Sequence, residues 1–284
     1  MSKQVQWARR KNITLTGSKG TKGFPAYTQI LEENLFEPLA PEVRADILNG
    51  DGGEIIGTIN SPAKMNAIHS SSALGVNIFH YWKTIGKIDI IAHACRLCAK
   101  NNSTQADIRF EQKFPISRAF QFAPNIDVVI ENNQEAQYEV FAIECKFSEA
   151  YSSYKHSGLK PKYLDRALDT LWRDIPGLHS LASSISPDDN EYKHLHPAQL
   201  IKHILGLKNK YKKKSSFRLL YLWYDALGEE GFVHRSEIEK FAKIAKADNI
   251  NFSSITYQEL ITFLANNHYL TNEKYINYIT ERYL

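Results

Sequence analysis

The sequence PNIDVVIENNQEAQYEVFAIECKF, residues 124–147, contains the clearest evidence for the fold. Two runs rich in apolar residues, 126–130 and 138–147, flank the polar segment 131–137, which is typical of a turn. Both runs have the composition of β-strands, in which successive side chains point to opposite faces of the sheet. Because the connection is short, we expect the two strands to pair as an antiparallel hairpin.

The charged side chains of this hairpin are expected on one face of it. Glu144 and Lys146 are two residues apart in the second strand, so they point the same way, while the aromatic and aliphatic residues around them point the other way. In the first strand, Asp127 is expected to point away from Ile126 and Val128. Pairing of the two strands then allows Asp127 to approach Glu144.

Two carboxylates beside a lysine on an apolar hairpin indicate a metal site that acts on phosphate. Adjacent carboxylates repel each other and raise the pKa of one of them unless a cation lies between them. Magnesium suits such a site, because it takes oxygen ligands from one or two carboxylates, water and phosphate. The metal stabilises the charge that develops on the phosphate and lowers the pKa of a bound water. The lysine adds a compact charge that can hold the attacking water or the phosphate.

A simpler interpretation of the same residues is a salt-bridge ladder. Glu144 and Lys146 would then pair across strands on a face exposed to solvent. Val140 and Ala142 share their face, so this face is not strongly polar. The metal site is therefore favoured over the ladder.

The hairpin resembles the PD-(D/E)XK motif of a nuclease superfamily that includes many restriction endonucleases. The matching residues are Pro124, Asn125, Ile126 and Asp127, then Glu144, Cys145 and Lys146 after a hairpin-length gap. The proline and the aspartate are not adjacent here, which departs from the usual pattern. The segments GDGGE, KMNAIHSSSALGVNIFHYW and RLLYLWYD extend the resemblance, to one restriction-endonuclease-like group, over residues 50–260.

The resemblance implies both the chemistry and the fold. Asp127 and Glu144 would bind Mg²⁺, for which Mn²⁺ can substitute, and Lys146 would be the catalytic lysine. Cleavage of DNA would leave a 5′-phosphate and a 3′-hydroxyl. The implied fold is an α/β, restriction-endonuclease-like fold with a central mixed sheet of four to five strands flanked by helices. On this basis we expect a basic N-terminal arm and lead-in, residues 1–48, followed by a nuclease domain, residues 49–284.

The remaining periodicity agrees with such a fold. Further strands are expected at 107–114, 217–224 and 250–255, from alternating or continuous apolar patterns. Helices are expected after the cap candidates Ser70–Ser72, with a break or a second helix after Gly86. Three more helices are expected. One starts at Pro161 and extends to Ile175. The other two start at capping boxes, formed by Ser236 with Glu239 and by Thr256 with Glu259.

Two further acids are candidates for the metal site. Glu111 lies on the polar face of the strand 107–114, where a surface acid beside Lys113 is the simpler interpretation. Glu54, in GDGGE, can serve as the upstream acid that such nucleases often place on a leading helix, or it can be an ordinary turn residue. Asn77 falls on the apolar face of its helix, and a structural hydrogen bond is the favoured role there.

The composition predicts a buried core, and the lack of an export signal leads us to expect a cytoplasmic protein. It has 284 residues, of which 43% are apolar. No apolar run is long enough for a membrane span, and the basic N-terminus lacks the apolar segment of a secretory signal. The three cysteines are therefore expected to be reduced.

Positive charge gathers in two blocks, although the net charge is only +4. Residues 1–31 contain six Lys or Arg and residues 192–224 contain eight, and neither block contains an acid. Such blocks can neutralise phosphates and release counterions, but a solvated loop or helix face has the same composition. The histidines of the second block, His194, His196 and His203, are expected to face DNA or solvent.

The expected partner is double-stranded DNA. The residues expected to contact it are Arg9, Arg10, Lys11, Lys155, Lys160, Lys162, Lys208, Lys210, Lys212, Lys213 and Lys214. A homodimer would supply two active sites for two strands. Restriction or another defence against foreign DNA is the expected role. The alternatives are a nuclease of the same fold in repair, recombination or transposition, and a non-catalytic DNA-binding module, which the complete set Asp127, Glu144 and Lys146 disfavours.

Overall fold

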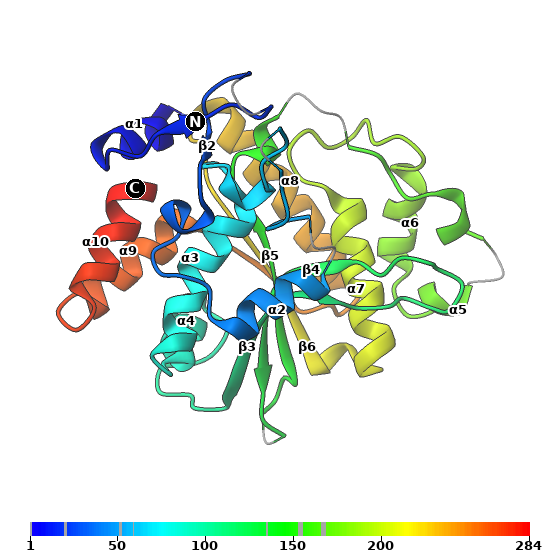
Figure 1. Cartoon of the computed structure of the whole chain (residues 1–284). Coiled ribbons are helices and arrows are strands. Elements are labelled where there is room, and N and C mark those ends of the chain that lie inside the picture. The colour runs from blue at the N-terminus through cyan, green and yellow to red at the C-terminus, as the bar shows by residue number, and fades with distance from the viewer. Residues whose placement is uncertain are drawn as a thin grey trace.

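A five-stranded mixed sheet forms the centre of the computed structural model, which describes residues 2–19, 22–50, 53–58, 60–134, 136–152, 156–165 and 169–284 (Figure 1). The strands are β3 (Gln105–Lys113), β4 (Asn125–Asn132), β5 (Val140–Lys146), β6 (Phe217–Trp223) and β7 (Phe252–Thr256), adjacent in this order. The pairs from β3 to β5 are antiparallel, and the pairs from β5 to β7 are parallel. The expected α/β fold with a mixed sheet is confirmed.

Helices cover both faces of this sheet. One face packs against α2 (Pro41–Asn49), α3 (Ser71–Thr84), α4 (Ile88–Ala94), α9 (Tyr257–His268) and α10 (Glu273–Tyr283), and the other against α6 (Pro176–Ser184), α7 (Pro197–Tyr211) and α8 (Gly228–Ala247). The shorter elements are α1 (Ser2–Arg10), β1 (Leu15–Thr16), β2 (Tyr27–Thr28), η1 (Leu31–Asn34), η2 (Lys64–Asn66), η3 (Glu149–Tyr151), η4 (Pro161–Tyr163), α5 (Asp169–Trp172) and η6 (Lys214–Ser216). Among the described residues, no helix has the length and apolar character needed to cross a membrane.

The predicted hairpin of β4 and β5 is present, with Val129 opposite Ala142. One prediction about its faces is wrong. Ile126 does not join Val128 in the core beneath α3, but packs with Val129 in the core beneath α7. The switch coincides with Glu111 on the neighbouring strand, whose φ of 50° is outside the extended range and rare for a residue with a side chain. The two strands are therefore kinked where the candidate acids lie.

The predicted helix ends are partly confirmed. The Ser70 side chain accepts a hydrogen bond from the Ala73 backbone and caps α3, and Thr256 and Glu259 form the expected capping box of α9. Gly86, with a φ of 65°, separates α3 from α4, so the two-helix alternative is the correct one.

Two predicted helices are wrong in extent. The segment from Pro161 to Ile175 is not one helix, because the chain leaves helical geometry at Leu164 and again at Ile175, the residue before Pro176. The predicted residue Leu168 lies outside the described residues. The second error concerns Ser236, which lies inside α8 rather than at its start, because that helix already begins at Gly228.

The N-terminal residues also differ from the expected arm. Residues 2–10 form α1, which packs against α10, so that segments from opposite ends of the chain lie side by side (Figure 1). Arg282 of α10 lies over the ring of Trp7, with 4.1 Å between the guanidinium carbon and the ring centre. Val43 and Ile47 of α2 belong to the same buried cluster as the sheet. The lead-in thus packs as part of the main core.

Candidate active site

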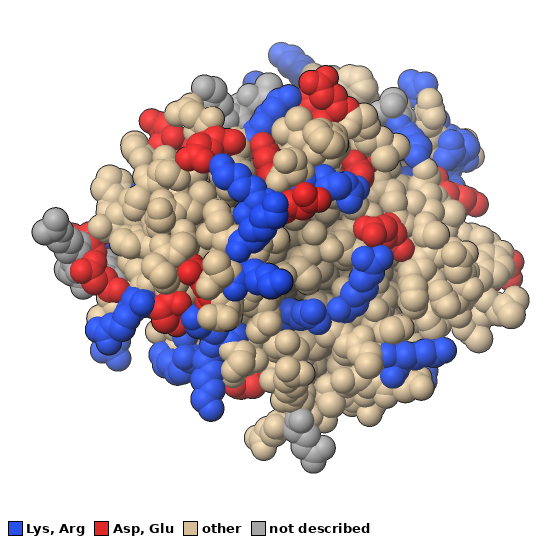
Figure 2. All heavy atoms as spheres, turned by 180° about the vertical axis from the view of Figure 1, so that it is seen from behind, with Lys and Arg blue, Asp and Glu red and all other residues tan. Residues whose placement is uncertain are grey.

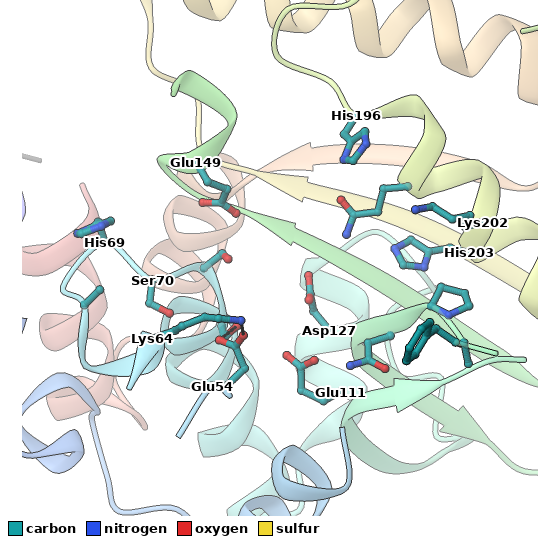
Figure 3. A pocket seen from close by; sticks show the side chains of 18 of the residues that line it. Glu54, Lys64, His69, Ser70, Glu111, Asp127, Glu149, His196, Lys202 and His203 are labelled. Atoms are coloured by element: carbon teal, nitrogen blue, oxygen red, sulfur yellow. Dashed lines mark hydrogen bonds and ion pairs between the residues drawn. The ribbon is translucent and has the colours of Figure 1, made fainter. Parts of the chain in front are cut away.

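A pocket of about 660 Å³ opens where β3 ends and β4 begins. Its lining includes two groups of polar side chains that face each other (Figure 3). We call one group the acidic wall; its members are Glu54, Glu111 and Asp127. We call the other the α7 wall; its members are His196, Gln199, Lys202 and His203. The arrangement brings carboxylates from three separate segments opposite the polar side of one helix.

Asp127 reaches this pocket from β4. Its Oδ2 accepts a hydrogen bond from the Cys145 backbone N–H at 2.7 Å, which ties the acid to β5. Burial raises the pKa of Asp127 well above its usual range, and the neighbouring charges of Glu144 and Glu111 raise it further. Asp127 therefore lies beside the part of β5 that carries Glu144, since Val128 pairs with Ile143 and Asp127 itself bonds to Cys145.

Glu144 is completely buried and does not belong to the pocket lining. The Lys146 Nζ lies 2.6 Å from its Oε1, and the His203 Nε2 lies 2.8 Å from its Oε2. Burial alone would raise the pKa of Glu144, but the charges of Lys146 and His203 outweigh it and hold that pKa below its usual value. The alternative of a solvated salt-bridge ladder is therefore wrong, because this ion pair is inside the protein.

Lys146 is itself held as a cation. Burial works to lower its pKa, but Glu144, Asp127 and Glu149 outweigh burial and raise it. An ammonium group with a raised pKa keeps its proton at neutral pH. Lys146 can therefore supply fixed positive charge and hydrogen bonds, but it cannot accept a proton from water.

Both acids that the sequence left open, Glu111 and Glu54, line the pocket. Burial, together with the charges of Glu54 and Glu144, raises the pKa of Glu111 to about 8. Glu54 lies in a turn rather than on a helix, and it accepts hydrogen bonds from the Lys64 Nζ at 2.8 Å and from the Ser72 Oγ at 3.0 Å. Glu111 is thus not a plain surface acid beside Lys113.

The donor chemistry of the acidic wall fits a hard divalent cation. Carboxylate oxygens are the ligands that Mg²⁺ takes. Burial and the neighbouring acids raise the pKa values of Asp127 and Glu111, so a cation bound between these side chains would favour their charged forms. Within the described part of the chain, however, no three His, Cys, Asp or Glu side chains are already spaced to hold a metal ion. Water and phosphate would have to supply much of the coordination, as is usual for Mg²⁺.

The α7 wall contains functional candidates that the sequence did not assign to the site. His203 was expected to face DNA or solvent, but it is 1% exposed and bonded to Glu144. The position of His203 could have been inferred from the helical spacing of the polar residues around it. His196, Gln199 and His203 fall on one side of a helix whose other side carries buried leucines and isoleucines.

Asn77, by contrast, has the expected structural role. Its Oδ1 accepts a hydrogen bond from the Phe36 backbone at 2.7 Å, and its Nδ2 donates to the Tyr283 hydroxyl at 2.9 Å. These bonds join α3 to the N-terminal lead-in and to α10, away from the acidic wall.

The lysines expected to follow the catalytic strand have different positions. Lys155 lies outside the described residues. Lys160 and Lys162 are exposed, and the Lys162 Nζ lies 5.8 Å from the ring centre of Tyr163, a residue that lines the pocket. Lys162 is therefore close to the mouth of the candidate site, and Lys160 is near enough to Lys202 of the pocket lining for its charge to lower the pKa of that lysine.

The block 208–214 lies at the other end of the sheet. It precedes the first residue of β6, whereas Lys146 pairs with the last residue of that strand, roughly 20 Å away at ~3.3 Å per residue. Asp174 pairs with Lys208 and lies 3.6 Å from the Lys214 Nζ, and Lys210 lies over aromatic rings. Although the block itself contains no acid, Asp174, which is distant in sequence, therefore compensates part of its charge.

The basic residues of the N-terminus are also partly compensated. The Lys11 Nζ lies 2.9 Å from the Glu281 carboxylate, and Arg10 donates to the Glu281 carbonyl at 3.3 Å. Arg9 is exposed. On the face shown in Figure 2, lysines and arginines are interspersed with acids rather than joined in one uninterrupted track.

Comparison with known proteins gives one match. A family model described as "Restriction Endonuclease associating with ARP" matches residues 1–284. No curated protein and no solved structure matches the chain.

Proposed function

Since the chain belongs to the family of restriction endonucleases associating with ARP, which its full length matches, we propose that it is a metal-dependent endonuclease that hydrolyses phosphodiester bonds of double-stranded DNA. The observation that carries this proposal is the joint position of Asp127, Glu144 and Lys146. The two acids repel each other on neighbouring strands, and the lysine is held as a cation beside them. Restriction or another defence against foreign DNA, in the cytoplasm, is the role that we propose.

The acids of the site would bind the metal, and Lys146 would stabilise negative charge on the phosphate. Mg²⁺, or Mn²⁺ in its place, would supply positive charge at the phosphate and lower the pKa of a bound water. Asp127 and Glu144 are the proposed ligands, with Glu111 and Glu54 as further oxygen donors. Because both oxygens of Glu144 are engaged by Lys146 and His203, Glu144 would exchange one of these contacts to bind metal.

Lys146 has a defined part in this scheme. Its ammonium group, fixed by Glu144, stabilises the negative charge that grows on the phosphate during attack. It does not act as the general base, because its pKa is raised rather than lowered. The proton of the attacking water would go to another acceptor, such as a carboxylate of the acidic wall or bulk water.

Affinity for DNA is proposed to come mainly from cations near the pocket mouth, Lys160 and Lys162. Further contacts are proposed for Lys155, for Arg9 to Lys11 and for residues 208–214. The last two groups are partly paired with acids, so they have less free charge to offer DNA. A homodimer also remains a proposal. A same-fold nuclease of repair, recombination or transposition would use the same chemistry and is the second candidate.

The deciding experiment is digestion of supercoiled plasmid DNA with Mg²⁺, followed by sequencing of the ends. We expect cleavage that needs Mg²⁺ or Mn²⁺ and leaves 5′-phosphates. Asp127→Asn should abolish it without lowering the melting temperature, since the amide oxygen can still accept from Cys145 and one repelling charge is gone. Lys146→Met should be nearly inactive. Cleavage by Asp127→Asn at the wild-type rate, or in excess chelator, would contradict the mechanism.

A further inference from the structure

We propose that Lys202 forms a phosphate-binding subsite on the α7 wall, where it holds a backbone phosphate of the DNA opposite the carboxylates. This inference rests on the proposed function and adds the contact that draws a polyanion into an acidic pocket. Carboxylates that hold no metal do not attract DNA, so a cation on the facing wall favours the entry of a phosphate.

Lys202 is a partly buried cation whose side chain has no partner among the residues that the structure describes. It lines the pocket, and its Nζ donates no hydrogen bond and forms no ion pair with any described residue. Burial lowers its pKa, the charge of Lys160 lowers it further, and Glu144 works in the opposite direction. Keeping an ammonium group partly desolvated and unpaired is unfavourable for folding, which indicates a role outside stability.

The same helix shows what a structural lysine looks like. Lys208 is also partly buried on α7, but the chain pairs it with Asp174 and with the Leu171 carbonyl. Lys202 lies six residues earlier on the same helix, and within the described ranges no acid pairs with it. An anion from outside the protein could pair with Lys202 in the way that Asp174 pairs with Lys208.

The other cations of the site are already engaged. Lys146 is bonded to Glu144, and Lys64 is bonded to Glu54. Lys202 is therefore the lysine of the described pocket lining with charge to offer a phosphate. Gln199, one turn earlier, lines the pocket as well and can add a neutral hydrogen bond.

The packing of α7 fixes the position of Lys202 relative to Glu144 and the acidic wall. Its neighbour His203 bonds to Glu144 at 2.8 Å, and Ile201 and Ile204 are completely buried beneath the helix. Figure 3 shows the Lys202 side chain extended toward the middle of the pocket, across from Asp127 and Glu111. A phosphate bound there would lie between the lysine and the proposed metal ligands.

The test compares Lys202→Gln and Lys202→Arg with Lys243→Gln, a control that removes an exposed lysine from α8, away from the pocket. Each substitution is placed in the Asp127→Asn background, and affinity for a fluorescein-labelled duplex oligonucleotide is measured by anisotropy over a range of KCl concentrations in chelator. In the otherwise wild-type background, KM and kcat for plasmid cleavage are measured with Mg²⁺.

We expect Lys202→Gln to reduce the salt slope of DNA binding by about one unit, as for one lost phosphate contact. KM should rise roughly tenfold, in line with the loss of one charge-assisted hydrogen bond. Lys202→Arg should keep the slope, and Lys243→Gln should behave as the wild type. The melting temperature of Lys202→Gln should not fall, because no contact within the protein is lost.

The outcomes separate this inference from the proposed function. An unchanged salt slope and KM in Lys202→Gln overturn the subsite, even if the wild type cleaves DNA. A melting temperature that falls, with an unchanged slope, overturns it in favour of a structural lysine. If the wild type does not cleave DNA, the proposed function fails, yet the binding comparison still decides whether Lys202 holds phosphate. Inorganic phosphate serves as a further probe. If it displaces the labelled duplex from the protein with Lys202 but not from Lys202→Gln, the subsite is supported.

Discussion

At the scale of single residues, the carboxylate of Glu144 depends on two donors. Lys146 contacts one oxygen and His203 the other, and Glu144 has no exposure to solvent. Loss of one donor to a buried charged group costs about 1–3 kcal/mol. We therefore expect His203→Ala to lower the free energy of unfolding by about 2 kcal/mol and to reduce kcat, while His203→Gln, which can still donate, recovers most of both.

Urea denaturation and plasmid cleavage measure these two effects. A His203→Ala variant as stable as the wild type would show that Lys146 alone satisfies Glu144. Recovery by His203→Gln distinguishes the hydrogen bond from the volume of the imidazole ring.

The residues of the site differ in how well the sequence predicts them. Asp127, Glu144 and Lys146 belong to one hairpin, so alternation and a short turn are enough to group them. His203 comes from a helix 59 residues after Glu144, and its place depends on how α7 packs on the sheet. Local periodicity carries no information about such packing. Glu111 was visible as an acid on a strand, but not the kink at its φ of 50°.

At the scale of elements, two helical glycines set how closely α7 and α3 approach the sheet. A Cβ on Gly206 of α7 would lie 2.4 Å from the Phe114 carbonyl oxygen, which is backbone and cannot move aside. A Cβ on Gly75 of α3 would lie 3.3 Å from the Cys145 Sγ, a contact that a small shift can relieve.

We expect Gly206→Ala to lower the free energy of unfolding by about 2 kcal/mol through overpacking, although alanine favours a helix by about 1 kcal/mol over glycine. Gly75→Ala should be close to neutral and serves as the matched control. Because α7 carries the α7 wall, Gly206→Ala should also weaken cleavage. Thermal unfolding of both variants checks the prediction, and equal effects would contradict it.

Elements with strong internal patterns were the ones that the sequence predicted. All five strands of the sheet and the caps of α3 and α9 followed from alternation, apolar runs and cap residues. α1 was missed because its positive charge suggested an arm, and its packing partner, α10, comes from the far end of the chain. The error at Ser236 arose because a capping-box pattern also fits the middle of a helix.

At the scale of the whole molecule, buried His234 makes stability depend on pH. Its ring nitrogens bond to the hydroxyls of Tyr151 and Tyr221, both at 3.0 Å. Burial, with the nearby charges of His194, His156 and Arg235, lowers the pKa of His234 to about 3. Between that value and about 6.5, the unfolded chain binds a proton that the folded chain does not.

The free energy of unfolding that comes from keeping His234 neutral is therefore complete above about pH 6.5 and is lost as the pH falls toward 3. Its slope is about 1.4 kcal/mol per pH unit. The acids with raised pKa act in the opposite direction, so we compare the wild type with His234→Gln. Urea denaturation at several pH values should show a slope that is shallower by about that amount in the variant. Parallel slopes would contradict the prediction.

The contact between Glu144 and His203 also has a consequence for the cell that makes the protein. The ribosome delivers the chain from its N-terminus at about 5–20 residues per second, so the hairpin emerges well before α7. Until His203, 59 residues later, and then β6 have been translated, Glu144 lacks one donor and β5 lacks its parallel neighbour. We expect unfinished chains on the ribosome to be harmless to the host chromosome, which a cleavage assay on chains stalled before His203 would check.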